Sequence, residues 1–373
     1  MNNNASVAQK NSSTTTTHKL TAQYDIIVFS HLRWNFVYQR PQHILSRLSQ
    51  DYNIIVIEEP IAIGGNGNYE LENISSSLTL VRPKVESIAH IQHVLKELNL
   101  QSIDIVWFYS AAFVELTPYI NANTMIYDCM DELSQFKGAS QQLRVQEEFL
   151  IKKADLVFTG GKSLYEAKSK LSPNVYCFPS SVDVAHFKQS STYSKIPLDL
   201  AAIPKPIVGY IGVIDERINL NLIHETALAL PKISFIMIGP LAKIDEGDLP
   251  RAHNIHYLGM KSYDDLPFYL KHIDISMMPF ALNEATEFIS PTKTLEYMAA
   301  GKPIISTPIK DVTRDYSQVI EIVTNAYEFS QAIIKISSSE IKIDKSAYES
   351  ILKQTSWDAT TQKMLQIMKE RVE

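Results

Sequence analysis

The chain has 373 residues, of which 45% are hydrophobic and 20% charged, and its formal net charge is −6. This length predicts two domains, and the composition is that of a globular protein. The acidic balance gives nucleic-acid binding no support. Because the sequence has no run of 18 apolar residues and no basic and apolar leader, we expect neither a membrane span nor a secretory signal. Two isolated cysteines, Cys129 and Cys177, fit reduced thiols in a cytoplasmic protein.

The first half of the chain alternates between buried strands and helices after a polar start. Residues 1–20 are rich in Asn, Ser and Thr and are predicted to form a disordered tail. Apolar runs predict strands at 24–30, 53–57, 104–108, 124–127, 156–158 and 175–178. Helical spacing of apolar residues predicts helices at 41–49, 86–99, 140–153 and 163–170. This alternation implies a parallel sheet covered on both faces.

A second alternation follows a stretch without periodicity. Residues 187–206 gather polar residues and prolines, which predicts a linker between domains. Strands are then expected at 207–212, 234–239, 255–258, 273–278 and 303–307, and helices at 219–229, 264–271 and 356–371. We therefore predict an α/β protein with two doubly wound, Rossmann-like domains, residues 21–186 and 207–350. They face a cleft, and the C-terminal helix within 351–373 could return to the first domain. Ligands of such folds bind at the carboxyl ends of the strands.

The segment from Ser290 to Pro303 predicts a helix that holds an anion at its start. Ser290 can cap the helix and Pro291 fits its first position. The next turn carries Lys293, a cation against the positive end of the helix dipole, and a bound phosphate would offset that penalty. Glu296 lies three residues on, on the same face, within reach of an attached sugar. The alternative is an ordinary capped helix with Lys293 in water and Glu296 in an intrahelical pair.

The second half of the chain resembles the GT-B glycosyltransferases, specifically their family-4-like group. Residues 175–187 are similar to that group's strand and NGVD turn, with Ser180 and Ser181 in place of Asn-Gly. Three further segments resemble its GYxGxxxxR, xFLGxxxxxxLP and SPxKxxEYxAxGxPVVST motifs: residues 207–217, 256–267 and 290–307. The resemblance covers most of residues 175–307, whereas the first domain matches mainly in layout. It implies the GT-B fold, with a nucleotide-sugar site in the second domain.

The resemblance also implies which residues bind the donor. Arg217 and Lys293 would neutralise the leaving diphosphate, and Glu296 would accept hydrogen bonds from the ribose hydroxyls. The alternative for Arg217 is a surface arginine paired with Asp215 or Glu216. The remaining donor-binding candidates lie in or beside the same motifs: Gly212, Tyr257, Ile289, Ser290, Pro291 and Thr292.

The sequence departs from the family pattern at one acidic position. Family-4 enzymes usually place two glutamates eight residues apart, and eight residues before Glu296 stands Phe288, with Glu284 and Glu287 out of register. No Asp-x-Asp and no paired histidine spacing occurs, so we expect no metal and no cofactor besides the nucleotide sugar. The P-loop-like run from Gly160 to Ser163 lacks its first glycine and is predicted to be a strand–helix turn.

Polar residues follow the expected strands of the first domain, where loops meet the cleft. Asp128 and Asp131 could orient or deprotonate an acceptor hydroxyl, or else cap helices. Together with His31 they are the catalytic candidates. The acceptor-binding candidates share the loop after the first strand and the helix that follows it: Arg33, Trp34, Arg40 and His43. The alternative for this group is a capped surface helix with a solvated histidine.

The function expected from these observations is transfer of a sugar from a nucleotide diphosphate sugar, with UDP as the commonest choice in the family. The acceptor would be a glycan or a lipid-linked molecule in surface polysaccharide biosynthesis, and the resemblance implies retention of anomeric configuration. A lipid-linked acceptor would bring the protein to the inner face of the membrane as a peripheral protein. The alternatives are a nucleotide-sugar epimerase of the same layout and a non-catalytic sugar-nucleotide-binding protein.

Overall fold

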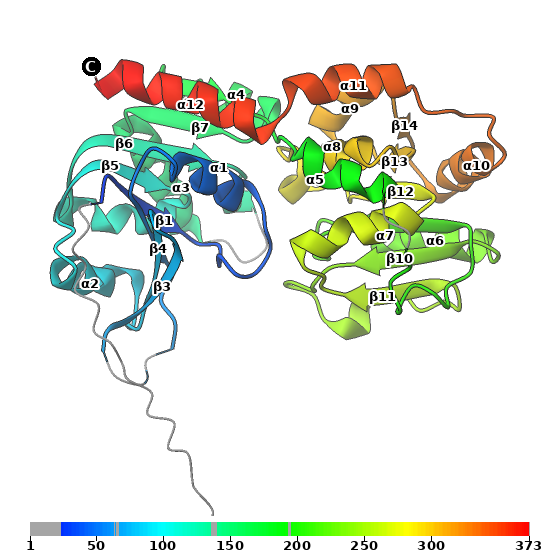
Figure 1. The fold of residues 1–373 in the computed structure, drawn as a ribbon, viewed down its shortest axis with the longest axis horizontal. Helices are drawn as coiled ribbons and strands as arrows, with labels where there is room; N and C mark the ends of the chain where they lie inside the picture. The colour runs from blue at the N-terminus through cyan, green and yellow to red at the C-terminus, as the bar shows by residue number, and fades with distance from the viewer. Residues whose placement is uncertain (1–23, 63, 65–66, 136–139, 193–194, 373) are drawn as a thin grey trace, which may run out of the picture.

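The computed structural model describes residues 24–372 except 63, 65–66, 136–139 and 193–194. The predicted disordered tail, residues 1–20, lies outside the described residues. The described chain forms two α/β domains that stand side by side (Figure 1). Each domain has one sheet with helices around it, as the alternating sequence pattern predicts.

The sheet of the first domain is parallel except at one edge. Its strand order is β3-β4-β2-β1-β5-β6-β7-β8, and only the β3–β4 pair is antiparallel among the described strands. The strands are β1 (Ile26–Ser30), β2 (Ile54–Glu58), β3 (Tyr69–Ser75), β4 (Leu78–Pro83), β5 (Ser102–Phe108), β6 (Asn121–Cys129), β7 (Leu156–Thr159) and β8 (Val175–Cys177). The hairpin of β3 and β4 was not predicted, because β3 is a polar edge strand with no continuous apolar run.

Two apolar clusters cover the two faces of this sheet. Ile27 and Phe29 of β1 belong to one cluster, and Ile26 and Val28 belong to the other, so the central strand is buried on both sides. The helices and 3₁₀ turns of this domain are α1 (Arg40–Leu48), Ile88–His90, α2 (Ile91–Glu97), Ala111–Tyr119, Leu133–Gln135, α3 (Gln141–Lys153) and α4 (Lys162–Lys168). The residues between β7 and α4 form the predicted strand–helix turn.

The sheet of the second domain is parallel throughout its described strands, in the order β11-β10-β9-β12-β13-β14. These strands are β9 (Ile207–Ile211), β10 (Ser234–Ile238), β11 (Ile255–Gly259), β12 (Ile275–Met278), β13 (Ile304–Ser306) and β14 (Glu321–Ile322). The strands β10 and β11, which follow β9 in sequence, lie on one side of it in the sheet. The later strands β12, β13 and β14 lie on its other side. This reversal creates a topological switch point between β9 and β12, where ligands bind in such sheets.

The helices of the second domain surround this sheet. They and the intervening 3₁₀ turns are α5 (Val184–Lys188), Gln189–Ser191, α6 (Leu220–Ala229), Glu246–Asp248, Tyr263–Asp265, α7 (Leu266–His272), Glu284–Thr286, α8 (Lys293–Ala299), α9 (Lys310–Tyr316), α10 (Ala326–Ser337) and α11 (Lys345–Gln354). Phe187 and Leu200, from the segment predicted as a linker, pack into the core of this domain. These described residues of the predicted linker therefore lie on the second domain.

The C-terminal helix α12 (Trp357–Val372) packs on the first domain although it follows the second in sequence. Trp357, Met364 and Met368 belong to an apolar cluster of the first sheet. The helix runs beside α1 (Figure 1), and Arg47 of α1 pairs with Asp358 at 2.6 Å. The chain thus crosses between the domains twice.

Candidate active site

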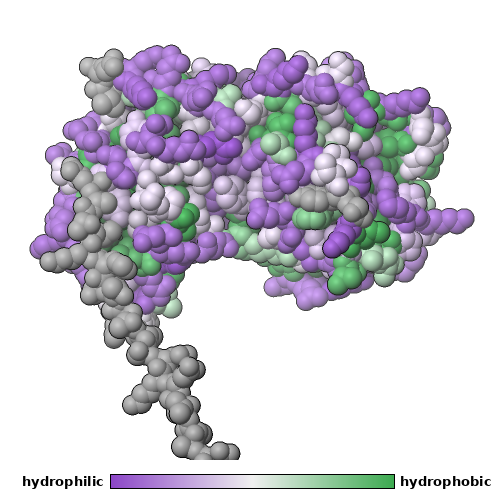
Figure 2. All heavy atoms as spheres, in the orientation of Figure 1, coloured by the Kyte–Doolittle hydropathy of each residue, from purple (hydrophilic) through white to green (hydrophobic). Residues whose placement is uncertain are grey.

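A cavity lies between the two domains at the carboxyl ends of their strands, and Figure 2 shows the surface hollowed between them. The first domain lines it with residues that follow β1, β6, β7 and β8: Val37, Tyr38, Gln39, Arg40, Met130, Asp131, Gly160 and Ser180. The second domain contributes Tyr210, Ile211, Gly212, Val213, Arg217, Tyr263, Leu266, Phe280, Ile289, Ser290, Pro291, Thr292, Lys293 and Glu296. We call this the anionic-ligand cavity, because its predicted donor residues include two cations.

Lys293 lies directly against Gly212 in this cavity. A Cβ placed on Gly212 would stand 2.0 Å from the Cε atom of Lys293 and 2.8 Å from its Nζ atom. Among the described residues, the side chain of Lys293 has no ion pair within 4 Å and no hydrogen bond. Desolvation lowers the pKa of its ammonium group, while the charge of Glu296 acts in the opposite direction. An anionic ligand would stabilise this charged lysine.

Arg217 reaches the same cavity while it is paired within its own loop. Its Nη2 atom lies 2.6 Å from Oδ2 of Asp215, and its Nε atom lies 3.0 Å from Oδ1. The ion pair with Asp215 that the sequence offered as the alternative is therefore present, but Arg217 lines the cavity rather than an open surface. Burial disfavours the charge, yet this carboxylate holds the pKa of Arg217 above its usual value. The guanidinium is thus a fixed cation.

The helix that carries Lys293 and Glu296 begins later than predicted. Helix α8 starts at Lys293, its N-cap residue is Thr292, and no side chain caps it. The predicted capping role of Ser290 and the helical position of Pro291 are therefore wrong. Instead, the Ser290 carbonyl accepts a hydrogen bond from the Ser180 hydroxyl of the first domain. This contact draws the segment before α8 toward the cavity wall.

Glu296 also lines the cavity, one helical turn after Lys293. Desolvation raises the pKa of its carboxyl group, and the neighbouring charge of Lys293 opposes that rise. A carboxylate in this position can accept hydrogen bonds from ligand hydroxyls. The structure therefore brings together Arg217, Lys293, Glu296, Gly212 and residues 289–292, as the sequence predicts for a donor site.

Tyr257 does not lie with the other donor-binding candidates. It is on β11, its hydroxyl donates to the Pro250 carbonyl at 3.1 Å, and Arg251 lies over its ring. Residues that follow β11, from Met260 to Tyr263, reach the cleft in its place. The motif at residues 256–267 thus identified the correct strand. It did not identify the residues after the end of that strand as the ones that line the cleft.

Asp128 lies near the end of β6 and Asp131 follows that strand, and of these two aspartates only Asp131 lines the cavity. Burial raises its pKa, and the positive charges of Arg217, Arg40 and Lys293 oppose this shift. Asp128 is fully buried and pairs with Arg40, whose Nε atom lies 3.0 Å from Oδ1 of the carboxylate. Arg40 also donates to the Phe178 carbonyl at 2.7 Å. Asp128 therefore contacts Arg40, which itself borders the cavity.

The histidine candidates lie beside the cavity rather than in its lining. Desolvation, with a contribution from the charge of Lys243, lowers the pKa of His31 to about 4. His43 is 4% exposed, and burial lowers its pKa to about 3. The ring of His43 stacks on Trp357 at 4.9 Å between centroids. Both imidazoles are consequently neutral near pH 7.

Arg33 and Trp34 belong to a network of the first domain. The guanidinium of Arg33 donates to Glu58 and to the carbonyls of Glu59 and Pro60, at 3.1, 2.6 and 3.0 Å. The backbone N–H of Trp34 donates to the same Glu58 carboxylate at 2.6 Å. Arg33 therefore anchors its own loop, whereas Trp34 lines a second part of the cleft.

That second part adjoins the anionic-ligand cavity and is mostly apolar; we call it the apolar part of the cleft. The two share Val37, Tyr38, Ile211, Gly212, Val213, Tyr263 and Leu266. The apolar part is completed by Trp34, Asn35, Phe36, Ile238, Gly239, Pro240, Met260, Lys261 and Ser262. Several of these residues follow β9, β10 and β11, so they form one half of the crevice at the end of the sheet.

Sequence reasoning missed the aromatic residues that connect the domains across the cleft. Tyr38 of the first domain stacks on Tyr263 of the second with ring centroids 4.7 Å apart. His186 stacks on Tyr263 at 4.2 Å with nearly parallel rings. These residues are far apart in sequence, and no motif links them. Only the packing of the domains brings them together.

No group of three or more His, Cys, Asp or Glu side chains is placed to hold a metal ion in the part of the chain that the structure describes. Within the same residues, no helix combines the length and apolar character required to cross a bilayer.

Known proteins resemble this chain both in sequence and in structure. Residues 205–339 match the family described as glycosyl transferases group 1. A Bacillus subtilis strain 168 protein named as a teichuronic acid biosynthesis glycosyltransferase, TuaH, is 25% identical over 227 residues. That alignment covers 56% of this chain and 56% of TuaH, so it spans about half of the relative.

The structural matches are more distant in sequence but nearly complete in coverage. Sucrose-phosphate synthase from Thermosynechococcus elongatus superposes with a TM-score of 0.70 at 13% identity, covering 92% of this chain and 98% of that chain. Anabaena HepE, in a complex with UDP and glucose, gives a TM-score of 0.63 at 14% identity, covering 93% and 100%. The chain has the GT-B fold. The predicted fold class is confirmed.

Proposed function

We propose that this protein is a glycosyltransferase that moves a sugar from a nucleoside diphosphate sugar, with UDP as the nucleotide, to a glycan or lipid-linked acceptor. The observation that carries the proposal is the position of Arg217 and Lys293 in a cavity at the switch point of the second sheet. Such cavities in doubly wound sheets accept nucleotides. The glycosyltransferase family match over the same domain supports this assignment.

In this proposal the diphosphate lies against Lys293, Arg217 and the backbone of residues 289–292. Two fixed cations stabilise the charge that develops on the leaving diphosphate, and their partial burial strengthens that interaction. Glu296 accepts hydrogen bonds from ribose hydroxyls. The nucleoside extends over the ends of β9, β10 and β11, in the apolar part of the cleft. These side chains are proposed to act without a metal ion.

The acceptor approaches from the first domain. Asp131 lines the cavity opposite Arg217 and Lys293, and Arg40 borders it with its charge held by Asp128. We propose that Asp131 orients the acceptor hydroxyl. In a retaining transfer the new glycosidic bond forms on the face that the diphosphate leaves. A diphosphate oxygen accepts the hydroxyl proton as the bond from the sugar to the diphosphate breaks, so no protein nucleophile is required.

The other first-domain candidates have supporting places in this proposal. His31, with its low pKa, acts as a neutral hydrogen-bonding group beside the cleft. Arg33 fixes the loop that carries Trp34, and His43 supports Tyr38 and Tyr263 at the junction of the domains. The name of the TuaH relative, a teichuronic acid biosynthesis glycosyltransferase, supports a role in surface polysaccharide biosynthesis. We propose separately that the acceptor lies at the inner face of the membrane.

The test is thermal-shift binding of UDP, GDP, dTDP, CDP and NAD, each with and without EDTA. We expect one nucleoside diphosphate to raise the melting temperature with or without EDTA, and the Lys293→Ala variant to lose that shift. Lys335→Ala, at an exposed position on α10, is the matched control. Turnover of the sugar nucleotide without an acceptor would instead indicate an epimerase. Binding without any transfer to glycan acceptors would indicate a non-catalytic protein, and stabilisation by NAD alone would refute the proposal.

A further inference from the structure

The first domain contributes an exposed aromatic side chain to the apolar part of the cleft. Phe36 lines this part and is 43% exposed. Its neighbour Tyr38 stacks on Tyr263, whereas Phe36 has no aromatic partner among the described residues. Exposing a phenyl ring to water is unfavourable by about 25 cal/mol per Å² of apolar surface. A ligand that covered the ring would recover part of that free energy.

The loop that carries Phe36 is held by a buried carboxylate. Glu58, at the end of β2, is 1% exposed and accepts a hydrogen bond from the backbone N–H of Trp34 at 2.6 Å. The same carboxylate pairs with Arg33 at 3.1 Å and with Arg82 of β4 at 3.5 Å. Two cations thus balance one buried anion. This arrangement fixes the backbone immediately before Phe36.

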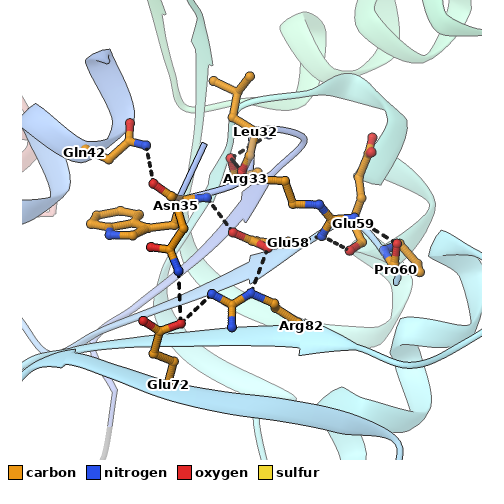
Figure 3. Close-up of polar contacts among 11 residues, drawn as sticks. Leu32, Arg33, Asn35, Gln42, Glu58, Glu59, Pro60, Glu72 and Arg82 are labelled. Carbon is orange, nitrogen blue, oxygen red and sulfur yellow. Dashed lines mark hydrogen bonds and ion pairs between the residues drawn. The ribbon is translucent and has the colours of Figure 1, made fainter. Parts of the chain in front are cut away.

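Further hydrogen bonds hold the loop on both sides of Phe36. Gln42 of α1 donates from its side chain to the carbonyls of Trp34 and Val37, at 2.9 and 3.0 Å. Asn35 donates to Glu72 of the β3 edge strand at 3.3 Å, as Figure 3 shows. These hydrogen bonds hold the backbone of the loop in one conformation. Ligand binding to Phe36 therefore requires little further ordering of the loop.

We propose that Phe36 stacks on the base of the nucleoside diphosphate, and that Glu58 is the positioning residue that holds it there. This inference rests on the proposed function and deepens it, because it assigns part of the donor site to the first domain. The apolar part of the cleft is formed on its other side by residues after β10 and β11, including Pro240 and Met260. A flat base between these residues and a phenyl ring would be shielded from water on both faces.

The lining residues place Phe36 on the nucleoside side rather than on the acceptor side. Phe36 lines only the apolar part of the cleft, whereas Asp131 and Arg40 line only the anionic-ligand cavity. Gly212 and Tyr263 line both, so a ligand whose phosphates reach Lys293 can extend its base toward Phe36.

Calorimetric titration with two probes, UDP and inorganic pyrophosphate, separates the two ends of the site. We expect Phe36→Ala to weaken UDP binding by about tenfold, the usual scale for loss of one stacked base, and to leave pyrophosphate binding unchanged. Phe36→Tyr keeps the aromatic face and should bind UDP as the wild type does. Lys293→Ala should weaken both probes. Tyr327→Ala, a 74% exposed aromatic on α10, should affect neither.

The positioning role of Glu58 is tested by a double-mutant cycle. Glu58→Gln should weaken UDP but not pyrophosphate, and adding Phe36→Ala to it should weaken UDP by less than Phe36→Ala does alone. A structural defect without positioning would weaken both probes or leave the two substitutions additive. If Glu58→Gln does not fold, the Phe36 variants still test whether Phe36 stacks on the base.

The inference fails if Phe36→Ala binds UDP as the wild type does, or if it raises only the KM for the acceptor. Either result leaves the proposed function intact, because the wild type still binds UDP. If the wild-type protein binds neither UDP nor another nucleoside diphosphate, the proposed function itself fails, and the inference fails with it.

Discussion

At the scale of single residues, the site depends on the contact between Gly212 and Lys293. Gly212 follows β9 with φ of 156°, and the Lys293 side chain lies where a Cβ would be. Only glycine leaves that space open, because any other residue would place a Cβ atom there. Gly212 therefore allows the ammonium group of Lys293 to occupy this position. Asp215 has a similar effect on Arg217, because it holds the guanidinium at the cavity wall.

We expect Gly212→Ala to weaken nucleoside diphosphate binding by about tenfold or more, equivalent to ~1.4 kcal/mol. The added methyl group would overlap the Lys293 side chain and displace its ammonium group. Calorimetric titration measures the effect, and Gly247→Ala is the matched control, because a Cβ there meets nothing within 4 Å. Unchanged affinity in Gly212→Ala would mean that the lysine does not bind the phosphates from this position.

At the scale of elements, the two domains are joined where α4 meets α9. Asp311 of α9 is 3% exposed and accepts the Ser163 backbone N–H at 3.1 Å, together with the Ser163 hydroxyl. A carboxylate from the second domain thus caps the first turn of a helix in the first domain. Lys162 and Asp315 add a partly exposed pair beside it. The buried cap should contribute more stability than the exposed pair.

Asp311→Ala is expected to lower the free energy of unfolding by about 1–3 kcal/mol, because the Ser163 N–H and hydroxyl would lose their buried acceptor. Asp315→Ala removes only the partly exposed pair and should cost less than about 1 kcal/mol. Urea unfolding of both variants gives the comparison. Equal losses of unfolding free energy in the two variants would contradict the larger contribution expected of the buried cap, and no loss in Asp311→Ala would show that the cap does not stabilise the domain contact.

At the scale of the whole molecule, α12 and an aromatic cluster connect the domains on the side of α1. His43 of α1 contacts Trp357 of α12 and lies edge-on to Tyr263 of the second domain. Burial is the largest cause that lowers the pKa of His43, and the charges of Arg47 and His186 act in the same direction. The contact of His43 with Trp357 and Tyr263 therefore favours the neutral form of its imidazole ring.

The pH dependence of stability follows from this preference. The unfolded chain binds a proton at His43 below about pH 6.5, whereas the folded chain does so only near pH 3. The unfolded state therefore holds more protons between these values, and stability is lost as the pH falls through this range. We expect His43→Phe to recover about 2–3 kcal/mol of the loss between pH 7 and pH 4.5.

Urea unfolding at the two pH values measures this effect, with His93→Phe, at an exposed position, as the control. An identical pH dependence in the wild type and His43→Phe would place the source of acid sensitivity elsewhere. His31, whose pKa is about 4 in the folded protein, would be the next group to test.

The sequence by itself determined the alternation of strands and helices and the segment around Lys293 and Glu296. Apolar runs and helical spacing are local signals, so they located most strands of both sheets. Because these signals are local, they also explain why β3 was missed and why the start of α8 was misplaced. The polar edge strand β3 has no apolar run, and Ser290, expected to cap α8, instead accepts a hydrogen bond from Ser180 of the other domain.

Only the tertiary structure decided which candidates meet in one cleft. It placed Asp131 in the cavity and Asp128 beneath it, paired with Arg40, although the two aspartates are three residues apart. It also brought Phe36 and Tyr263 into the site. Tyr263 lies within the motif segment 256–267, but the motif did not point to it, and its position in the cleft follows from domain packing. The position of Phe36 follows from the charges around Glu58. Such long-range contacts leave no periodic or compositional signal in the chain.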